Sequence, residues 1–194
     1  EGVMENPHVD VAFGLHINIE APSLGAPIVL KYIQSFALLY DYLKKQLNMN
    51  ISRSITTYAS GWSRDYAPHI LREDYTPSLA MLMDDYMSFN PSRNYALDML
   101  PLFLHLDEAR VQSHMQDELI KPRPAFHFRM PNCRIDEPQW SFSEEWQHWL
   151  QVERVAQNDG LRRSLIKKYH HNERRFLRHF DSKWIKTVET ALRD

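Results

Sequence analysis

The stretch VDVAFGLHINIE, Val9–Glu20, decides the fold class of this chain. Its odd positions are all apolar, whereas its even positions include His16, Asn18 and Glu20. Strict alternation with many β-branched residues predicts a strand, because successive side chains of a strand point to opposite faces. One face of this strand would pack on a core, and the other would carry the three polar side chains side by side.

A second segment, LIKPRPAFHFRMPN at 119–132, shows the same alternation between prolines that disfavour a helix. Its apolar positions are Phe126, Phe128 and Met130, and the positions between them and before them are Ala125, His127 and Arg129. This pattern predicts a second strand over 125–130 with one apolar and one polar face.

Size and composition fit a single globular domain. The chain has 194 residues, of which 43 % are hydrophobic and 25 % charged, which is enough apolar material for a substantial core. Its formal net charge of −2 offers no broad surface to a polyanion, so no nucleic-acid partner is expected. Its apolar runs are shorter than the roughly 18 residues of a membrane span, so no membrane partner is expected either.

The single cysteine, Cys133, excludes an intrachain disulfide and a cysteine-based zinc cluster. It favours a reducing compartment, so we expect a cytoplasmic protein. No pattern marks a base that would make Cys133 a nucleophile. The chain begins at Glu1 rather than Met, and a strand is predicted within its first ten residues, so we expect upstream sequence to belong to the same protein.

Apolar residues at helical spacing predict helices over 28–48, 78–88, 107–117, 142–157 and 161–193. Pro27 suits the first position of the first helix, and Lys44 and Lys45 suit the negative end of its dipole.

The helix over 142–157 has signals at both ends. Ser141 and Glu144 have the spacing of a capping box at its start. Asn158-Asp159-Gly160 is expected to end it.

Two segments have no clear period. Residues 49–77 are polar and irregular, which predicts a functional loop. Residues 94–105 fit either a strand or a helix and are interrupted by Pro101. With the two strands and the helices, the chain is expected to form an α+β domain in which helices pack on the apolar face of an antiparallel sheet.

The polar faces of the two strands hold the residues that could carry chemistry. His16, His127 and Glu20 supply two imidazoles and a carboxylate, which can hold a divalent cation, while Asn18 lies between them. The guanidinium of Arg129 can bind phosphate oxygens in a bidentate way. This set suits phosphoryl or acyl-phosphate chemistry, in which catalysis depends on positioning and charge neutralisation.

Structural explanations for the same residues stay open. A half-exposed antiparallel sheet commonly has a solvated polar face. His127 could be a core histidine and Arg129 a partner in a buried ion pair, because structural ion pairs also cluster on sheets.

The C-terminal tract KKYHHNERRFLRH, 167–179, is basic, but acidic and apolar residues are interspersed with its charges. A solvated helix face therefore explains it better than a nucleic-acid surface. The tryptophans Trp146, Trp149 and Trp184 fall on apolar helix faces and are expected in the core.

Three short motifs now resemble a known family in order and spacing. They are Gly14-Leu15-His16-Ile17-Asn18, the stretch Arg93-Asn94-Tyr95-Ala96-Leu97-Asp98, and Phe126-His127-Phe128-Arg129. Over residues 9–157 the chain resembles the putative amidoligase family, a branch of the glutamine synthetase-like carboxylate–amine ligase superfamily.

The resemblance implies an ATP-dependent ligase that phosphorylates a carboxylate and lets an amine displace the phosphate, giving an amide. It implies that His16 binds Mg²⁺ and that Asn18 contacts the nucleotide phosphates. Arg129 would stabilise the transferred phosphoryl group, and Arg93 would bind a phosphate or a substrate carboxylate. His127 stands where the family usually has a glutamate, which would serve Mg²⁺ better because this ion prefers oxygen ligands.

Members of this family also have a Gly-Val-Glu-x-Glu strand with metal-binding carboxylates, which is expected upstream of Val9. Gly2-Val3-Met4-Glu5 resembles it in part. We therefore expect residues 1–157 to form the ligase-like domain, with N-terminal strands preceding the chain, and residues 158–194 to form a C-terminal helical extension.

The expected substrates are a carboxylate and an amine, with peptides among the candidates, and the expected cofactors are ATP and Mg²⁺. Two other functions stay open. One is a non-catalytic binding module that keeps the ligase scaffold, and the other is a metal-dependent hydrolase that uses His16 and His127. The sequence leaves the oligomeric state open.

Overall fold

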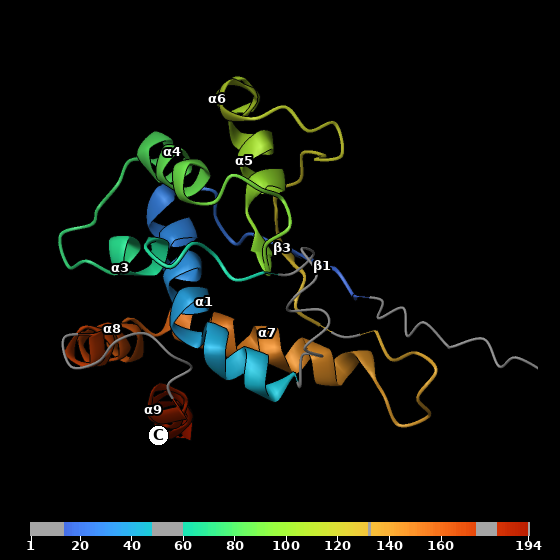
Figure 1. The fold of residues 1–194 in the computed structure, drawn as a ribbon, viewed down its shortest axis with the longest axis vertical. Coiled ribbons are helices and arrows are strands. Elements are labelled where there is room, and N and C mark those ends of the chain that lie inside the picture. Colours follow the sequence, from blue (N-terminus) through green and yellow to red (C-terminus); the bar gives the residue numbers. More distant parts are fainter. Residues whose placement is uncertain (1–13, 48–59, 132, 174–181, 194) are drawn as a thin grey trace, which may run out of the picture.

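The computed structural model describes residues 14–47, 60–131, 133–173 and 182–193. Within these ranges the chain folds as an α+β domain, as predicted (Figure 1). Its elements are β1 (Ile17–Glu20), α1 (Ala26–Gln46), α3 (Tyr66–Ile70), α4 (Leu79–Phe89), β2 (Leu97–Asp98), α5 (Leu100–Leu106), α6 (Glu108–His114), β3 (Ala125–Phe128), α7 (Phe142–Gln157), α8 (Asp159–Glu173) and α9 (Ser182–Arg193).

The strands form a three-stranded antiparallel sheet in the order β1-β3-β2. Asn18 lies opposite His127 on the central strand, and His127 lies opposite Asp98. Directly opposed residues share a face of the sheet, so these three side chains form a row across it. We call this side the polar face. It also includes His16 and Arg129, which follow the same two-residue period just beyond the ends of β1 and β3.

The first strand is shorter than predicted. Val9 to Phe13 lie outside the described residues, and β1 begins only at Ile17. The N–H of Leu15 donates to the carbonyl of Pro131 at 3.1 Å, one residue out of register with the β1–β3 pairs. Because Pro131 has no N–H to donate, the regular ladder ends before it.

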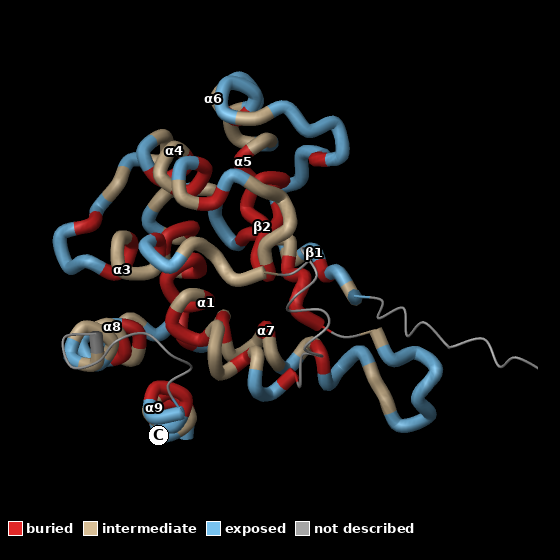
Figure 2. Tube along the Cα trace, viewed as in Figure 1, coloured by how far each residue is buried: buried red, intermediate tan, exposed pale blue. Residues whose placement is uncertain are grey.

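Aromatic side chains from two helices cover the apolar face of the sheet. Phe126 and Phe128 point to this side from β3 and are fully buried. Tyr32 of α1 stacks on Phe126 with ring centroids 4.9 Å apart, and Phe36 of α1 meets Phe128 edge-on at 6.2 Å. Trp149 of α7 lies 5.7 Å from Phe126 and 5.5 Å from Phe128. The buried residues accordingly concentrate where α1 and α7 approach the strands (Figure 2).

The two helices on the sheet were predicted almost to the residue. Helix α1 starts two residues before the predicted range, so Pro27 is its second residue rather than its first, and Lys44 and Lys45 lie in its last turn as expected. Helix α7 spans the predicted residues, but the capping box is wrong. The Ser141 hydroxyl makes no capping bond and instead meets the Ser143 hydroxyl at 3.0 Å.

Of the predicted functional loop over 49–77, residues 49–59 lie outside the described residues, and the rest is mainly irregular, as predicted, while its functional role stays a prediction. The rest contains α3 and belongs to the core, where Tyr66 is fully buried. Trp62 donates its indole N–H to the Leu97 carbonyl at 2.9 Å. The large aromatic residues of this polar segment therefore anchor it against β2 and α4.

The segment with the ambiguous pattern, 94–105, contains both kinds of element. It forms β2 and then turns into α5, where Pro101 occupies the first turn. A proline is tolerated there because the first N–H groups of a helix have no partner within it.

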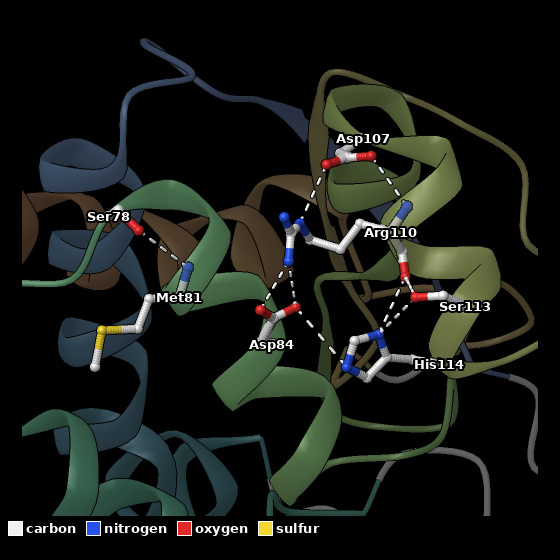
Figure 3. Close-up of polar contacts among 7 residues, drawn as sticks. All are labelled: Ser78, Met81, Asp84, Asp107, Arg110, Ser113 and His114. Atoms are coloured by element: carbon white, nitrogen blue, oxygen red, sulfur yellow. Dashed lines mark hydrogen bonds and ion pairs between the residues drawn. The ribbon is translucent and has the colours of Figure 1, made fainter.

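Helices α4 and α6 are joined by a polar cluster (Figure 3). The guanidinium of Arg110 contacts Asp84 of α4 at 2.7 Å and Asp107, the N-cap of its own helix, at 3.1 Å. The predicted helix over 78–88 corresponds to α4, and its N-cap Ser78 accepts the N–H of Met81 at 3.2 Å.

The described residues of the C-terminal part form two helices, α8 and α9, and residues 174–181 between them lie outside the described ranges. Helix α8 starts directly after α7, because the Asn158 side chain accepts the N–H of Leu161 at 2.9 Å and begins a new helix. Helix α9 docks on α1, where Trp184 donates its indole N–H to the Leu38 carbonyl at 3.1 Å. No described helix is long and apolar enough to cross a membrane.

The three tryptophans that were predicted to lie in the core differ in how far they are buried. Trp149 is fully buried, and Trp184 is 7 % exposed. Trp146 is only partly buried but packs against the core.

Candidate functional site

The polar face brings together residues that were predicted to share a site. His16 and His127 meet edge-on with ring centroids 5.2 Å apart. The Asn18 Oδ1 and His127 Nδ1 atoms are 2.9 Å apart. The prediction that the two strands are neighbours and carry these side chains on one face is therefore confirmed. Glu20 lies on the same strand opposite Ala125, further from the two histidines.

Arg123, which was not among the predicted site residues, fixes the orientation of this group. Its Nη1 atom lies 3.1 Å from the same Asn18 Oδ1 atom. A guanidinium can only donate, so the Asn18 atom that it contacts is the oxygen. The His127 Nδ1 atom must then carry its hydrogen and donate to this oxygen as well. The neutral ring therefore keeps a lone pair on Nε2.

The surroundings of His127 oppose a positive charge on its ring. Burial, the largest cause, acts together with the neighbouring His16, Arg129, Arg123 and Arg93 to lower its pKa to about 3. His127 is thus neutral at physiological pH. Because an unfolded histidine binds a proton near its ordinary pKa of 6.5, acidification from there towards pH 3 removes stability from the folded state.

We expect NMR of the imidazole nitrogens to find His127 neutral at pH 5, with its hydrogen on Nδ1. In Arg123→Leu, the Asn18 amide loses the donor that fixes its orientation, so both tautomers of His127 should be populated. Lys121→Leu, which removes another exposed cation of the same loop, is the matched control and should keep the Nδ1–H form. A protonated ring at pH 5 in the unaltered chain would contradict this geometry.

Arg129 is more buried than a residue that binds ligand from solution. It is 5 % exposed, and its Nη1 atom donates to the Arg93 carbonyl at 2.6 Å. Its backbone N–H donates to the Ala96 carbonyl at 2.8 Å, which extends the pairing beyond β3. Burial lowers its pKa, while the carboxylate of Asp98 acts in the opposite direction. Arg129 therefore joins the segment before β2 to the central strand.

Arg93 lies at the rim of the polar face. About a third of its side chain is exposed, and its Nε atom pairs with Asp117 Oδ2 at 3.0 Å. Its charge acts on both His127 and Asp98. Arg93 and Arg123 are thus the cations of this face that a dissolved anion can reach most directly.

Asp98 is a site residue that the sequence prediction did not include. It is 3 % exposed, and its Oδ1 atom accepts the N–H of Leu100 at 2.9 Å. Burial raises its pKa to about 7, although this hydrogen bond and the charges of Arg129 and Arg93 act to lower it. Its position at the end of the Arg93–Asp98 motif is the sequence signal that could have identified it as a site residue.

The structure brings two of the three predicted metal ligands, His16 and His127, close together. Among the described residues, no group of three histidine, cysteine, aspartate or glutamate side chains could hold a metal ion. Glu20 is four residues from His16, which is roughly 13 Å along a strand. The pair of His16 and His127 is close, but Mg²⁺ prefers oxygen ligands. Metal binding by His16, His127 and Glu20 stays a prediction.

A comparison with family models supports the resemblance. The model described as "putative amidoligase enzyme" matches residues 2–151, which is most of the chain. The chain belongs to this family. No curated protein and no solved structure matched it in the corresponding searches.

Membership of the putative amidoligase family indicates an amide-forming ligase. The matched region contains every residue of the polar face and includes Gly2-Val3-Met4-Glu5, which lies outside the described residues. It ends within α7, so α8 and α9 follow it.

Two other features of this family member are poorer candidates for the active site. Hollows of about 480 and 520 Å³ flank α8. Both are lined by Lys167 and His171, beyond the matched region, and although Arg72 and Glu73 of that region line the smaller one, neither hollow is lined by a residue of the polar face. In the cluster between α4 and α6, the Ser113 Oγ and His114 Nδ1 atoms lie 3.3 Å apart, an arrangement that resembles a nucleophile and its base (Figure 3). The Ser113 hydroxyl, however, donates to the Arg110 carbonyl at 2.7 Å, so this cluster is structural.

Proposed function

We propose that this chain is an ATP-dependent ligase that joins a carboxylate to an amine through an acyl phosphate. One observation carries the proposal. The row of Asn18, His127 and Asp98 crosses all three strands, with Arg93 and Arg123 beside it, within the region that matches the amidoligase family.

In the proposed reaction, a carboxylate oxygen attacks the γ-phosphorus of ATP, and ADP leaves. The amine nitrogen then attacks the acyl carbon, the C–O bond to phosphate breaks, and the amine loses a proton. Both steps move negative charge between oxygens, which arginine side chains stabilise by paired hydrogen bonds. Carboxylates and amines, including those of peptides, are the proposed substrates.

The polar residues divide these tasks by accessibility and pKa. Arg93 and Arg123 bind the oxyanions. Arg129 holds the backbone of Arg93 through its carbonyl and adds a buried positive charge next to the site. Asn18 contacts the nucleotide phosphates. The proton of the amine passes to solvent, because Asp98 is only 3 % exposed and His127, whose pKa is about 3, is a poor acceptor.

When bound, Mg²⁺ would neutralise phosphate charge in this site. Among the described residues, Asn18 and Asp98 are the oxygen donors in the row, which is too few to hold the ion without further ligands.

The proposal is tested by supplying ATP with a panel of carboxylates and amines and measuring ADP release. The carboxylate should carry ¹⁸O, because an acyl phosphate transfers one carboxylate oxygen to the released phosphate. ADP release that needs a carboxylate, with ¹⁸O in phosphate, is the expected result. An amide product without ¹⁸O in phosphate would contradict the acyl-phosphate route.

The second candidate is a binding module that keeps the ligase scaffold without catalysis. It is favoured by the small number of carboxylates beside the two histidines among the described residues. Such a module would bind ATP or a carboxylate at the polar face and release no ADP with any member of the panel.

The sheet with helices on one face supports an α+β fold, and a glutamine synthetase-like arrangement of these elements is part of the proposal. The cytoplasm is the compartment in which we propose that the reaction takes place, because it supplies ATP under reducing conditions.

A further inference from the structure

The loop between α6 and β3 places an aspartate beside the site. Asp117 Oδ1 accepts the N–H of Leu119 at 2.9 Å, and the Asp117 carbonyl accepts the N–H of Ile120 at 3.1 Å. Ile120 is buried in the core, and the N–H of Arg123 donates to the Pro101 carbonyl at 2.9 Å. The turn that carries Asp117 is therefore anchored on both sides.

The second carboxylate oxygen of Asp117 is directed at Arg93. Asp117 Oδ2 lies 3.0 Å from Arg93 Nε, and about a third of each side chain is exposed. Among the described residues, Asp117 is the one carboxylate within ion-pairing distance of this guanidinium. Contact at Nε leaves the two terminal nitrogens of the guanidinium, with four N–H groups, for another acceptor.

The backbone of Arg93 is held as well. Its carbonyl accepts a hydrogen bond from Arg129 at 2.6 Å, and the N–H of the next residue, Asn94, donates to Ser92 Oγ at 3.2 Å. The long Arg93 side chain is thus fixed at its base by Arg129 and near its tip by Asp117. An arginine fixed in this way loses less conformational entropy when it binds a ligand.

We propose that Asp117 is a positioning residue that holds the Arg93 guanidinium at the rim of the polar face, where its terminal nitrogens bind an oxyanion. The oxyanion is a nucleotide phosphate or a substrate carboxylate, since both present paired oxygens to a guanidinium. This inference rests on the proposed function, because it assigns Arg93 to the ligand of that site. The negative charge of Asp117 lies near the bound anion and repels it. Asp117 therefore favours binding by orienting Arg93 and not through its own charge.

The test compares Asp117→Asn with Glu118→Gln, which makes the same change of charge at an exposed neighbour in the same turn. Affinity for ATP and for each carboxylate of the panel would be measured by calorimetry, with KM and kcat where turnover is found. Asp117→Asn should weaken binding of one of these ligands roughly tenfold, as expected for a lost charge-assisted contact. Glu118→Gln should leave it unchanged, and both variants should melt close to the original chain.

A double-mutant cycle separates positioning from a general structural role. In Arg93→Ala, further replacement of Asp117 by Asn should have no added effect on affinity, because the residue it positions is absent. The ligand whose affinity falls identifies the oxyanion as phosphate or carboxylate.

Unchanged or tighter binding in Asp117→Asn, or effects that add in the cycle, would overturn the inference while leaving the proposed function standing. If the unaltered chain binds neither ATP nor any carboxylate at the polar face, both fail together. NMR of the Arg93 Nε–H signal adds a readout that needs no ligand. This signal should broaden in Asp117→Asn and stay sharp in Glu118→Gln, and an unchanged signal in Asp117→Asn would also overturn the inference.

Discussion

Replacement of Arg129 by lysine is expected to lower turnover by a factor of about 10² to 10³, although the charge is kept. Lysine is a point charge and cannot reproduce the planar contacts of a guanidinium. In this structure the loss has a second cause, since Arg129 donates to the Arg93 carbonyl and its removal frees the segment before β2. A loss of stability of roughly 1–3 kcal/mol should accompany the change, because the residue is buried.

ADP release and thermal unfolding would be measured on the same samples of Arg129→Lys. Arg163→Lys is the matched control, because Arg163 is an exposed arginine of α8, beyond the region that matches the family. It should leave both quantities nearly unchanged. Full turnover with a lowered melting temperature in Arg129→Lys would show that the residue is only structural.

Replacement of Trp149 by alanine is expected to cost about 3–5 kcal/mol of unfolding free energy, as for other large aromatic residues removed from a core. Its ring is fully buried against Tyr32, Phe126 and Phe128, with centroids at 6.1, 5.7 and 5.5 Å. The cavity would open beneath the central strand, so the polar face should lose its order as well.

Trp149→Phe separates packing from the polar indole group. Within the described part of the chain, the buried indole N–H of Trp149 has no hydrogen-bond partner. Phenylalanine removes this unsatisfied donor while keeping most of the ring contacts, so it should cost much less than alanine. Chemical denaturation of both variants provides the measurement. Equal losses in the two variants would show that the indole group itself is needed.

The sequence predicted the face of each strand correctly because alternation is a local signal. The period of two placed His16, Asn18 and His127 on one side and the phenylalanines of β3 on the other, and the register confirms it. The long helices were found for the same reason, since their period of about 3.6 residues extends over several turns.

The remaining features depend on contacts between distant segments. In the sequence, residues 60–77 look like a polar loop in spite of their aromatic residues. Only the packing of Trp62 and Tyr66 against α4 and β2 makes this segment part of the core. The break between α7 and α8 was predicted as an end, but Asn158 also begins the next helix.

The candidate site was predicted in part for the same reason. Residues on β1 and β3 came from a pattern within each strand, whereas Asp98 and Arg123 join the site through strand pairing and a loop. A residue such as Asp117 has no local signal at all, because its role depends on Arg93, which is distant in the sequence. Glu20 has the right spacing for the face and lies opposite Ala125, two residues further along β1 than the Asn18–His127 pair.

The central claim is that the polar face of the sheet binds the nucleotide. It is tested most directly by titrating the chain with ATP and following the imidazole signals of its histidines by NMR. Signals of His16 and His127 should shift in step with saturation, while those of His170 and His171, which line a basic hollow beside α8, should stay in place. Shifts confined to His170 and His171 would place the anion at the C-terminal helices and contradict the account.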